Sequence, residues 1–480
     1  MTTGGDQAPG GVTGPDDWDD AAVERFRNYA ELVVHGRSAL RADALAIAAA
    51  ALAAVDPAAA LRDALSLESD ELAVTDPAGG ERHVFDLHGR RLFVLGAGKA
   101  SVGMAMVLDE LLGARLSDGA VVVKRGQAEP LRHIEVLEAA HPVPDEASLR
   151  GGLRLLEIAQ AAGPDDLLLA LVTGGSSALA VAPAEGISLA DTAETGRVLL
   201  ASGADIVSIN DVRKHLSRIK GGRLGRLAGC EIVNFTVSDV VGDPLYYITD
   251  LTVPDRSTFA DAAGACDRFG LWDELPRAVV EHLRRADPAD DTCHELEDVT
   301  SFVMADARMM CDAAARAAAA LGYRPQVLRL DLEGESAAAG AWFAARVAAA
   351  PSGVALVAGG ETTTTLGAAG VTAAGGPSQE AALAGAIRLG SLGRDDPGAC
   401  LLYLDSDGTD GPTDAAGALV DDVTAEALAA AGTDAAGALA SHRAGAALAS
   451  LADVVLTGPT GTNVNDLKIG LTAGALPREE

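Results

Sequence analysis

Short apolar runs that end in glycine-rich turns constrain the fold of this chain more than any other feature of its sequence. Residues 91–95 (RLFVL) lead into the turn GAGK at 96–99, and residues 165–172 (DDLLLALV) lead into TGGSS at 173–177. A helix-like stretch follows each turn. Short strands that alternate with helical patterns of about 10–15 residues are typical of βαβ units around a parallel sheet. The sequence therefore predicts an α/β fold.

Two domains are expected, because 480 residues exceed the size at which a single hydrophobic core stays efficient. The alternation is interrupted near residues 260–300 and then resumes, which predicts that the second half repeats the architecture of the first. We place an N-terminal domain at 21–270 and a C-terminal domain at 271–480. Residues 1–20 lack apolar periodicity and are predicted to form a disordered tail.

Composition excludes several classes of protein. The net charge of −32 would repel nucleic acid and anionic membranes. No apolar run of about 18 residues is present, and the N-terminus does not resemble an export signal. The five cysteines are scattered and never form a CxxC pair, which argues against disulfides and zinc. We therefore expect a soluble, cytoplasmic protein whose acidity fits either salt adaptation or a compositional bias.

Lysine is rare in this chain, since arginine outnumbers it 32 to 5. Lys99 lies in the first turn, beside Gly96 and Gly98. An ammonium group is a compact donor that can follow a migrating phosphoryl group, and amides at a strand-to-helix turn can bind an anion. The turn therefore predicts either a phosphate site or, alternatively, a purely structural turn for tight strand–helix packing.

The second turn adds hydroxyl groups to the same pattern. Gly174 and Gly175 are followed by Ser176 and Ser177, whose hydroxyls can bind phosphate or a carboxylate. In a parallel sheet, both turns open at the carboxyl edge of the strands, where ligands usually bind. A helix cap by Ser176 is the alternative, but it explains only one of the two hydroxyls.

A cationic segment at residues 210–223 interrupts the acidic chain with five Lys and Arg residues. Arg213 and Lys220 are seven residues apart and face the same way if the segment is helical. With Asn210 at its start, this stripe is suited to a carboxylate and to phosphates. A solvated helical face is the alternative interpretation.

Acidic residues after strands could supply the ligands of Mg²⁺ and a base for a hydroxyl nucleophile. The candidates are Asp239, Asp243, Glu361, Asp405, Asp407 and Asp410. Capping and turn formation are the alternatives for each of them. The segment DSDGTDG is not a calcium loop, because position 12 is Ala416 where a Glu is required. A structural hydrogen bond is the favoured role for His141 in HPVPD.

The ordered motifs resemble those of the type-2 glycerate kinases over residues 22–469. These motifs are GAGKASVGMA, HPVPDEAS, VTGGSSALAVAP, INDVRKHLSRIKGGRLGRL, SDVVGD, GGETTTT, DGPTDAAGA and LTGPTGTNVNDL. The resemblance implies a Rossmann-like N-terminal domain and a smaller α/β C-terminal domain containing the MOFRL region at about 352–475. It also implies an active site between the domains and ATP- and Mg²⁺-dependent phosphorylation of D-glycerate, usually to 2-phosphoglycerate. A homodimer is compatible with this interpretation.

The resemblance assigns roles to individual residues. Lys99 is expected to be catalytic together with Asp239. We expect Ser176, Ser177, Asn210, Arg213 and Lys220 to bind substrate. ATP is expected to contact Gly96, Gly98, Gly174, Gly175, Glu361 and Asp410, and Mg²⁺ to contact Asp239 and Asp410.

Two segments depart from the family pattern. Thr249-Asp250-Leu251 replaces Ser-Gly-Pro, and Pro377 replaces the arginine of Gly-Gly-Arg-Asn-Gln-Glu. Losing that cation favours an altered acceptor, such as another small hydroxy acid or a polyol, or a diverged nucleotide-binding protein without catalysis. The other alternative is an NAD(P)H-dependent hydroxypyruvate reductase. That activity requires a nicotinamide site, and the chain has no GxGxxG followed by an acidic residue about 20 positions later.

Overall fold

The computed structural model describes residues 21–239, 251–366, 374–392 and 398–474. The chain forms two compact units, which we call the inserted unit (Pro57–Met304) and the split unit (Met1–Asp56 with Ala305–Glu480). This division differs from the contiguous domains expected from the sequence, because helix α3 (Ser38–Ala53) packs on α13 (Ala307–Ala320) and on the C-terminal sheet. The predicted disordered tail at 1–20 lies outside the described residues.

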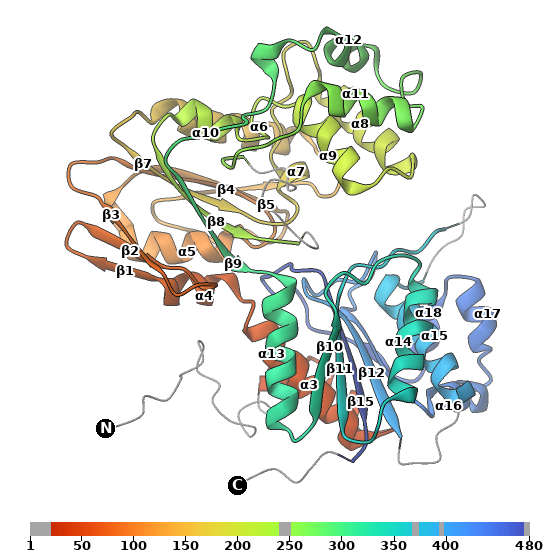
Figure 1. The fold of residues 1–480 in the computed structure, drawn as a ribbon. Coiled ribbons are helices and arrows are strands. Elements are labelled where there is room, and N and C mark those ends of the chain that lie inside the picture. The colour runs from red at the N-terminus through yellow and green to blue at the C-terminus, as the bar shows by residue number, and fades with distance from the viewer. Residues whose placement is uncertain (1–20, 240–250, 367–373, 393–397, 475–480) are drawn as a thin grey trace. The chain divides into compact units, whose positions relative to one another are not determined.

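The inserted unit is built on a six-stranded sheet, as the α/β prediction required (Figure 1). Its first five strands run parallel, and Gly96 in β4 lies between Val121 and Leu171 of the neighbouring strands. The strand order is β6 (Glu135–Ala139), β5 (Leu116–Lys124), β4 (Leu92–Ala97), β7 (Leu167–Val172), β8 (Glu231–Val237) and β9 (Val299–Ala305). The carboxyl ends of β4, β7 and β8 therefore share one edge.

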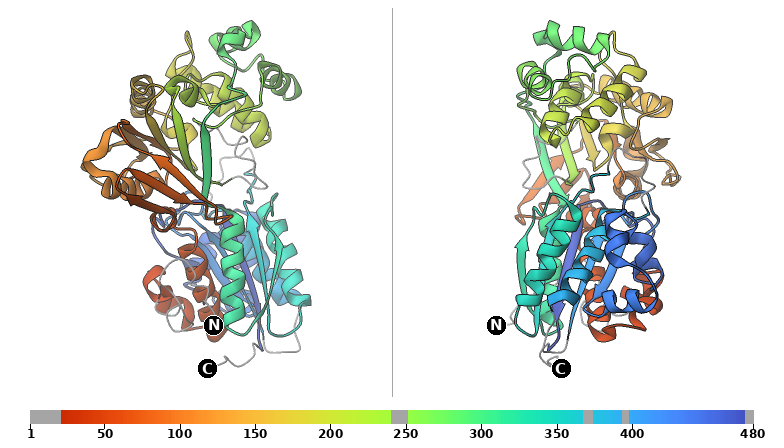
Figure 2. Two further views of the ribbon diagram at one scale, coloured as in Figure 1. Left: turned by 60° about the vertical axis from the view of Figure 1, so that its left-hand side comes forward. Right: turned by 90° about the vertical axis from the view of Figure 1, so that its right-hand side faces the viewer.

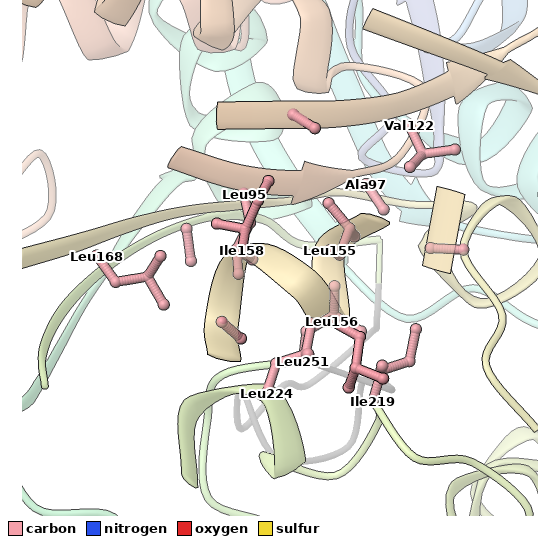
Figure 3. Packing of buried hydrophobic residues seen from close by; sticks show 14 of the residues in the cluster. Leu95, Ala97, Val122, Leu155, Leu156, Ile158, Leu168, Ile219, Leu224 and Leu251 are labelled. Atoms are coloured by element: carbon pink, nitrogen blue, oxygen red, sulfur yellow. The ribbon is translucent and has the colours of Figure 1, made fainter. Parts of the chain in front are cut away.

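Helices cover this sheet and supply its core. α5 (Ser101–Leu112) packs on β5 and β7, and α6 (Glu146–Ala161) packs on β4, β5 and β6 with α10 (Arg223–Ala228) beside it. Leu155 and Ile158 of α6 meet Leu95 and Leu168 of the sheet in a closed apolar cluster (Figure 3). A second apolar cluster joins α8 (Leu189–Ala201), α9 (Ile206–His215), α11 (Phe259–Arg268) and α12 (Arg277–Arg285).

A small antiparallel sheet precedes the parallel one and was not predicted. It consists of β1 (Leu65–Glu68), β2 (Glu71–Thr75) and β3 (Arg82–Asp86), which follow α4 (Pro57–Ala64). These strands are short and mostly half-buried or exposed on one face, so they carry a weak apolar signal.

The split unit contains a mixed six-stranded sheet, so the second half does not repeat the first. Only β10 and β11 are parallel, and the other pairs are antiparallel. Residues 406–416 between β12 and β13 are too few for the helical crossover that a parallel pair needs. The order is β10 (Arg324–Arg329), β11 (Val354–Gly360), β15 (Asp466–Thr472), β12 (Ala399–Asp405), β13 (Gly417–Asp421) and β14 (Val454–Val455).

Helices lie on both faces of the mixed sheet, with α3 and α13 on one side and α14 (Ser336–Ala349) and α15 (Pro377–Leu392) on the other (Figures 1 and 2). Gly340 of α14 allows close contact with α15, because a Cβ atom there would lie 2.0 Å from the carbonyl oxygen of Ala381. The shorter helices are α2 (Tyr29–Val33), α7 (Ser176–Leu179), α16 (Thr424–Ala430), α17 (Ala435–Ala440) and α18 (Ala444–Ala449), with 3₁₀ turns at Gly113–Arg115 and Pro288–Asp290.

None of the helices described here is by itself long and apolar enough to cross a membrane, although the consecutive helices α3 and α4 together meet the criteria of length and composition.

Candidate functional site

The two glycine turns of the inserted unit are bonded to each other. Lys99 donates its backbone N–H to the carbonyl of Gly174 at 2.9 Å, and Ala100 donates to the hydroxyl of Thr173 at 3.1 Å. The N–H of Gly98 donates to Val122 at 3.1 Å. The sequence predicted that amides of the first turn point toward an anion, but these three consecutive donors are used inside the protein. The first turn therefore fixes the position of Lys99.

Contacts with the neighbouring strand explain the glycines of the first turn. A Cβ atom at Gly98 would lie 2.0 Å from the hydroxyl oxygen of Thr173, and one at Gly96 would lie 2.5 Å from the carbonyl oxygen of Leu171. Gly98 also has φ +137°, which side chains rarely adopt. Tight packing between β4 and β7 accounts for both residues without a nucleotide.

The second turn differs from the first, because several of its amide and hydroxyl groups have no hydrogen-bond partner among the described residues. Within residues 21–239, 251–366, 374–392 and 398–474, no partner is found for the backbone N–H groups of Gly174, Gly175 and Ser177 or for the hydroxyls of Ser176 and Ser177. Three amides and two hydroxyls in one turn can surround phosphate oxygens. The TGGSS turn is thus the better anion site of the two.

Lys99 and His141 both lie close to this turn's central glycine. A Cβ atom at Gly175 would lie 3.4 Å from Cγ of Lys99 and 3.2 Å from Nε2 of His141. Gly175 has φ +88°, which side chains rarely adopt, so its conformation favours glycine. The sequence favoured a structural role for His141. Its position shortly after β6, at the edge shared with the two turns, was the signal that could have placed it in the site.

Asp239 follows β8 at the same edge and is half-buried. Burial raises the pKa of its carboxyl, and the nearby Lys99 ammonium opposes this shift and lowers the pKa. The structure thus brings Lys99, the TGGSS turn and Asp239 together in one unit, as the strand pattern predicted. Asp243 lies outside the described residues.

Lys220 reaches the TGGSS turn from its carbonyl side. Its buried ammonium donates to the carbonyls of Ser177 at 2.7 Å and Ala180 at 3.3 Å. Burial, together with the charge of Arg213, lowers the pKa of Lys220 to about 7. These bonds give Lys220 a positioning role, and the substrate contact that the sequence suggested stays a prediction.

Some cations of the segment at residues 210–223 are bonded within the protein, whereas others could still bind an anion. Lys214 forms a buried ion pair with Asp255, and Arg223 donates to the carbonyls of Lys214 and Lys220 at 2.8 Å each. Arg213 is half-buried, and its guanidinium has no hydrogen bond or ion pair in the part of the chain that is described. Burial lowers the pKa of Arg213. Its charge acts on Lys220, and among the described residues its guanidinium is still available to an anion.

Asn210 shares helix α9 with Arg213 and is buried. It lies three residues before Arg213, on a neighbouring part of the same helix face. The segment therefore places an amide and a guanidinium side by side on α9, and their contact with substrate stays a prediction.

The remaining predicted residues belong to the split unit. Glu361 is exposed and follows β11 directly. Asp410 is buried, and its two carboxylate oxygens accept the backbone N–H groups of Ser378 at 3.0 Å and Gln379 at 2.7 Å. Asp410 thereby caps α15, which begins at Pro377. Burial raises the pKa of Asp410 to about 6. The cap explains Asp410 without a nucleotide or a metal.

Two further carboxylates lie beside Asp410. Asp405 and Asp466 are direct partners on β12 and β15, and burial with the charge of Asp466 raises the pKa of Asp405 well above its usual range. Lys468 balances this cluster, since its ammonium lies 3.0 Å from Asp466. Among the residues described, no group of three His, Cys, Asp or Glu side chains is arranged to hold a metal ion.

Comparison with known proteins gives consistent matches over most of the chain. Residues 43–284 match a family described as a domain of unknown function (DUF4147), and residues 354–466 match the MOFRL family. A glycerate 2-kinase from Pyrococcus horikoshii is 38% identical over 398 residues, 81% of this chain and 88% of that protein. A protein from Agrobacterium vitis named as a hydroxypyruvate reductase is 39% identical over 387 residues, 79% of this chain and 98% of that protein. The crystal structure of a glycerate kinase from Thermotoga maritima has a TM-score of 0.74 and 34% identity, and the match covers 89% of this chain and 98% of that one.

Proposed function

Because the chain belongs to the type-2 glycerate kinase family, we propose that it transfers the terminal phosphoryl group of ATP to a hydroxyl of D-glycerate. The TGGSS turn beside Lys99 is the observation that carries this proposal. Its amides and hydroxyls can hold phosphate oxygens while the ammonium neutralises charge that develops during transfer. The residues do not favour the reductase named among the relatives, since the segment at the end of β4 reads GAGKAS where a nicotinamide site needs GxGxxG.

Each residue of the inserted-unit site has a separate task in this proposal. Lys99 contacts the migrating phosphoryl group, and the TGGSS turn holds the donor phosphates. Arg213 pairs with the carboxylate of D-glycerate, because a guanidinium suits bidentate carboxylate binding. Asp239 accepts the proton of the attacking hydroxyl, and the raised pKa of its carboxyl favours that proton transfer.

Mg²⁺ needs only one or two protein carboxylates when phosphates complete its coordination, and Asp239 fits this requirement. The ion would neutralise charge on the phosphate oxygens of ATP. Asp410 fits less well, since both of its carboxylate oxygens already accept backbone N–H groups. We therefore propose Asp239 as the metal ligand and leave Asp410 as the cap of α15.

The substitution at Pro377 bears on the acceptor. A proline at the first position of α15 fits that helix but supplies no charge. Arg213 is then the guanidinium that selects a carboxylate, so small hydroxy acids should be better acceptors than uncharged polyols. Steady-state rates for D-glycerate and glycerol test this order, and equal kcat/KM values for the two would contradict it.

The central test is the variant Lys99→Ala. Loss of a transition-state charge contact should lower kcat by roughly 100-fold or more, with little change in the circular dichroism spectrum. The assay couples ADP release to NADH oxidation in the presence of D-glycerate. Lys124→Ala is the matched control, because Lys124 lies at the end of the adjacent strand β5. Unchanged turnover in Lys99→Ala would remove Lys99 from the mechanism.

A further inference from the structure

A second cationic site lies in the inserted unit, and the described residues that line it belong to neither glycine turn. It is a cavity of about 400 Å³ whose lining includes Arg218, Arg223 and Arg226. We propose that this cavity binds a small phosphate monoester, held at its phosphate by Arg218 and Arg226. The proposal is separate from the kinase reaction and concerns a binding site with its own ligand.

The charges of the cavity carry the proposal. Arg218 and Arg226 are exposed, and neither guanidinium has a hydrogen bond or an ion pair with any residue that the structure describes. Arg226 follows Arg223 by three residues on α10, so their side chains lie on the same face. Two unpaired guanidinium groups at one cavity are unusual in a chain with a net charge of −32. They are suited to the several oxygens of a phosphate group.

The other ionisable groups of the lining are already engaged or balanced. Arg223 donates to backbone carbonyls, as described above, and so holds the wall of the cavity. His215 lies 2.9 Å from Asp291, and His282 lies 2.8 Å from the carbonyl of His215. The two carboxylates of the lining belong to Glu185 and Asp290. With neutral histidines, three arginines against two carboxylates leave the lining positive.

The size and the apolar part of the cavity favour an organic phosphate over inorganic phosphate. Small-molecule pockets typically have volumes of about 300–1,000 Å³, and this cavity lies within that range. Leu156 of α6 and Leu227 of α10 form part of its wall. They offer apolar contact to a short carbon skeleton while the arginines hold the phosphate.

One end of the cavity lies near residues at the start of β4. Gln160 lines it, and the carbonyl of the next residue, Ala161, accepts a hydrogen bond of 3.1 Å from Arg91. Arg91 precedes β4, whereas Lys99 follows the other end of that strand. A strand of six residues spans roughly 20 Å. The Gln160 end of the cavity is therefore remote from Lys99, and the described lining includes no residue of either glycine turn.

Calorimetric titration of the full-length protein tests the proposal. The protein is first saturated with a non-hydrolysable ATP analogue and D-glycerate, so that added phosphates cannot enter the kinase site. The probes are sn-glycerol 3-phosphate and inorganic phosphate, both at about 0.1 M ionic strength. The double variant Arg218→Gln/Arg226→Gln removes the two unpaired cations. Arg388→Gln is the matched control, since Arg388 is exposed on α15 and has no side-chain partner among the described residues.

We expect sn-glycerol 3-phosphate to bind at one site per chain and at least about tenfold more tightly than inorganic phosphate. The double variant should weaken its binding by about tenfold or more, while Arg388→Gln leaves it unchanged. Absence of binding to the wild-type chain, or equal binding by the double variant, would overturn the proposal. Equal affinity for the two probes would overturn the assignment of a monoester. Circular dichroism of both variants checks that the exposed substitutions leave the fold intact.

Discussion

Arg41 offers the sharpest test of how the two pieces of the split unit are joined. Its guanidinium is 1% exposed and lies 2.8 Å from Asp421 and 2.7 Å from Asp453, both fully buried. It also donates to the carbonyl of Leu32 at 3.1 Å. Arg41 comes from α3, whereas the two carboxylates come from the C-terminal sheet and its connections. The variant Arg41→Met therefore removes the cation between two buried acids.

The expected cost follows from burial. Removing one partner of a buried ion pair leaves an uncompensated charge and costs about 3–5 kcal/mol, so the split unit should lose this much unfolding free energy at pH 7. Burial raises the pKa of Asp453 to about 6 even though Arg41 lowers it, and Arg41 holds the pKa of Asp421 below its usual value against burial. Without Arg41, both pKa values rise in the folded state.

The pH dependence has a definite sign. A carboxyl whose pKa is raised by folding binds its proton more tightly in the folded chain, so stability increases as pH falls toward that pKa. The deficit of Arg41→Met should therefore shrink by roughly 1–3 kcal/mol between pH 7 and pH 5, since one unit of pKa corresponds to about 1.4 kcal/mol. Protonation of Asp453 accounts for most of this recovery.

Urea unfolding at the two pH values measures both effects. Fluorescence of Trp342, in a Trp18→Phe/Trp272→Phe background, reports on the split unit alone because Trp342 lies in α14. Arg37→Met is the control, since the side chain of Arg37 is 37% exposed and should contribute only about 0–1 kcal/mol. A loss below about 1 kcal/mol at pH 7, or an equal loss at both pH values, would refute the reasoning.

Two further predictions concern the TGGSS turn. Gly175→Ala should lower kcat at least about tenfold, because its Cβ would lie only 3.2 Å from the ring of His141 and would shift this ring at the centre of the turn. Gly186→Ala, with φ +85° and open space, should show only the backbone strain of about 1–2 kcal/mol and normal turnover. The second prediction concerns Lys220, whose pKa is lowered by burial from 10.5 to about 7. Because the unfolded chain binds this proton more tightly, the free energy of unfolding should rise between pH 7 and 10. The rise should be up to about 1.4 kcal/mol per pH unit. Urea midpoints at pH 7, 8 and 9 should show this rise in the wild-type chain and not in Lys220→Met, and parallel curves would contradict it.

The parallel sheet could be predicted because its strands are continuous apolar runs, whereas the direction of pairing in the mixed sheet could not. β15 is the last strand in sequence yet inserts between β11 and β12, and no local pattern encodes that order. The small sheet β1–β3 was missed because its strands are short and partly exposed. Local sequence therefore identifies strands that are buried on both faces more readily than their neighbours.

The candidate site also has one part that local sequence predicts and another part that depends on contacts between distant segments. Lys99 and the TGGSS turn were found because parallel strands end at one edge, a rule that needs only local sequence. The bonds of Lys220 to Ser177 and Ala180 join segments some 40 residues apart, and the cap from Asp410 to α15 joins segments about 30 apart. The charge and spacing of these residues identified them as candidates for the site. They could not show whether each side chain binds a ligand or a backbone group of the protein.

The split unit has a consequence for synthesis of the chain. α3 leaves the ribosome early, but ten of its residues are buried in a core that requires β12 and β15. Those strands are made roughly 350–420 residues later, which corresponds to roughly 20–80 s at about 5–20 residues per second. During this interval the inserted unit can fold, whereas the apolar surface of α3 stays exposed because the strands that cover it have not yet been synthesised. Chaperone contact during translation should therefore concentrate on α3.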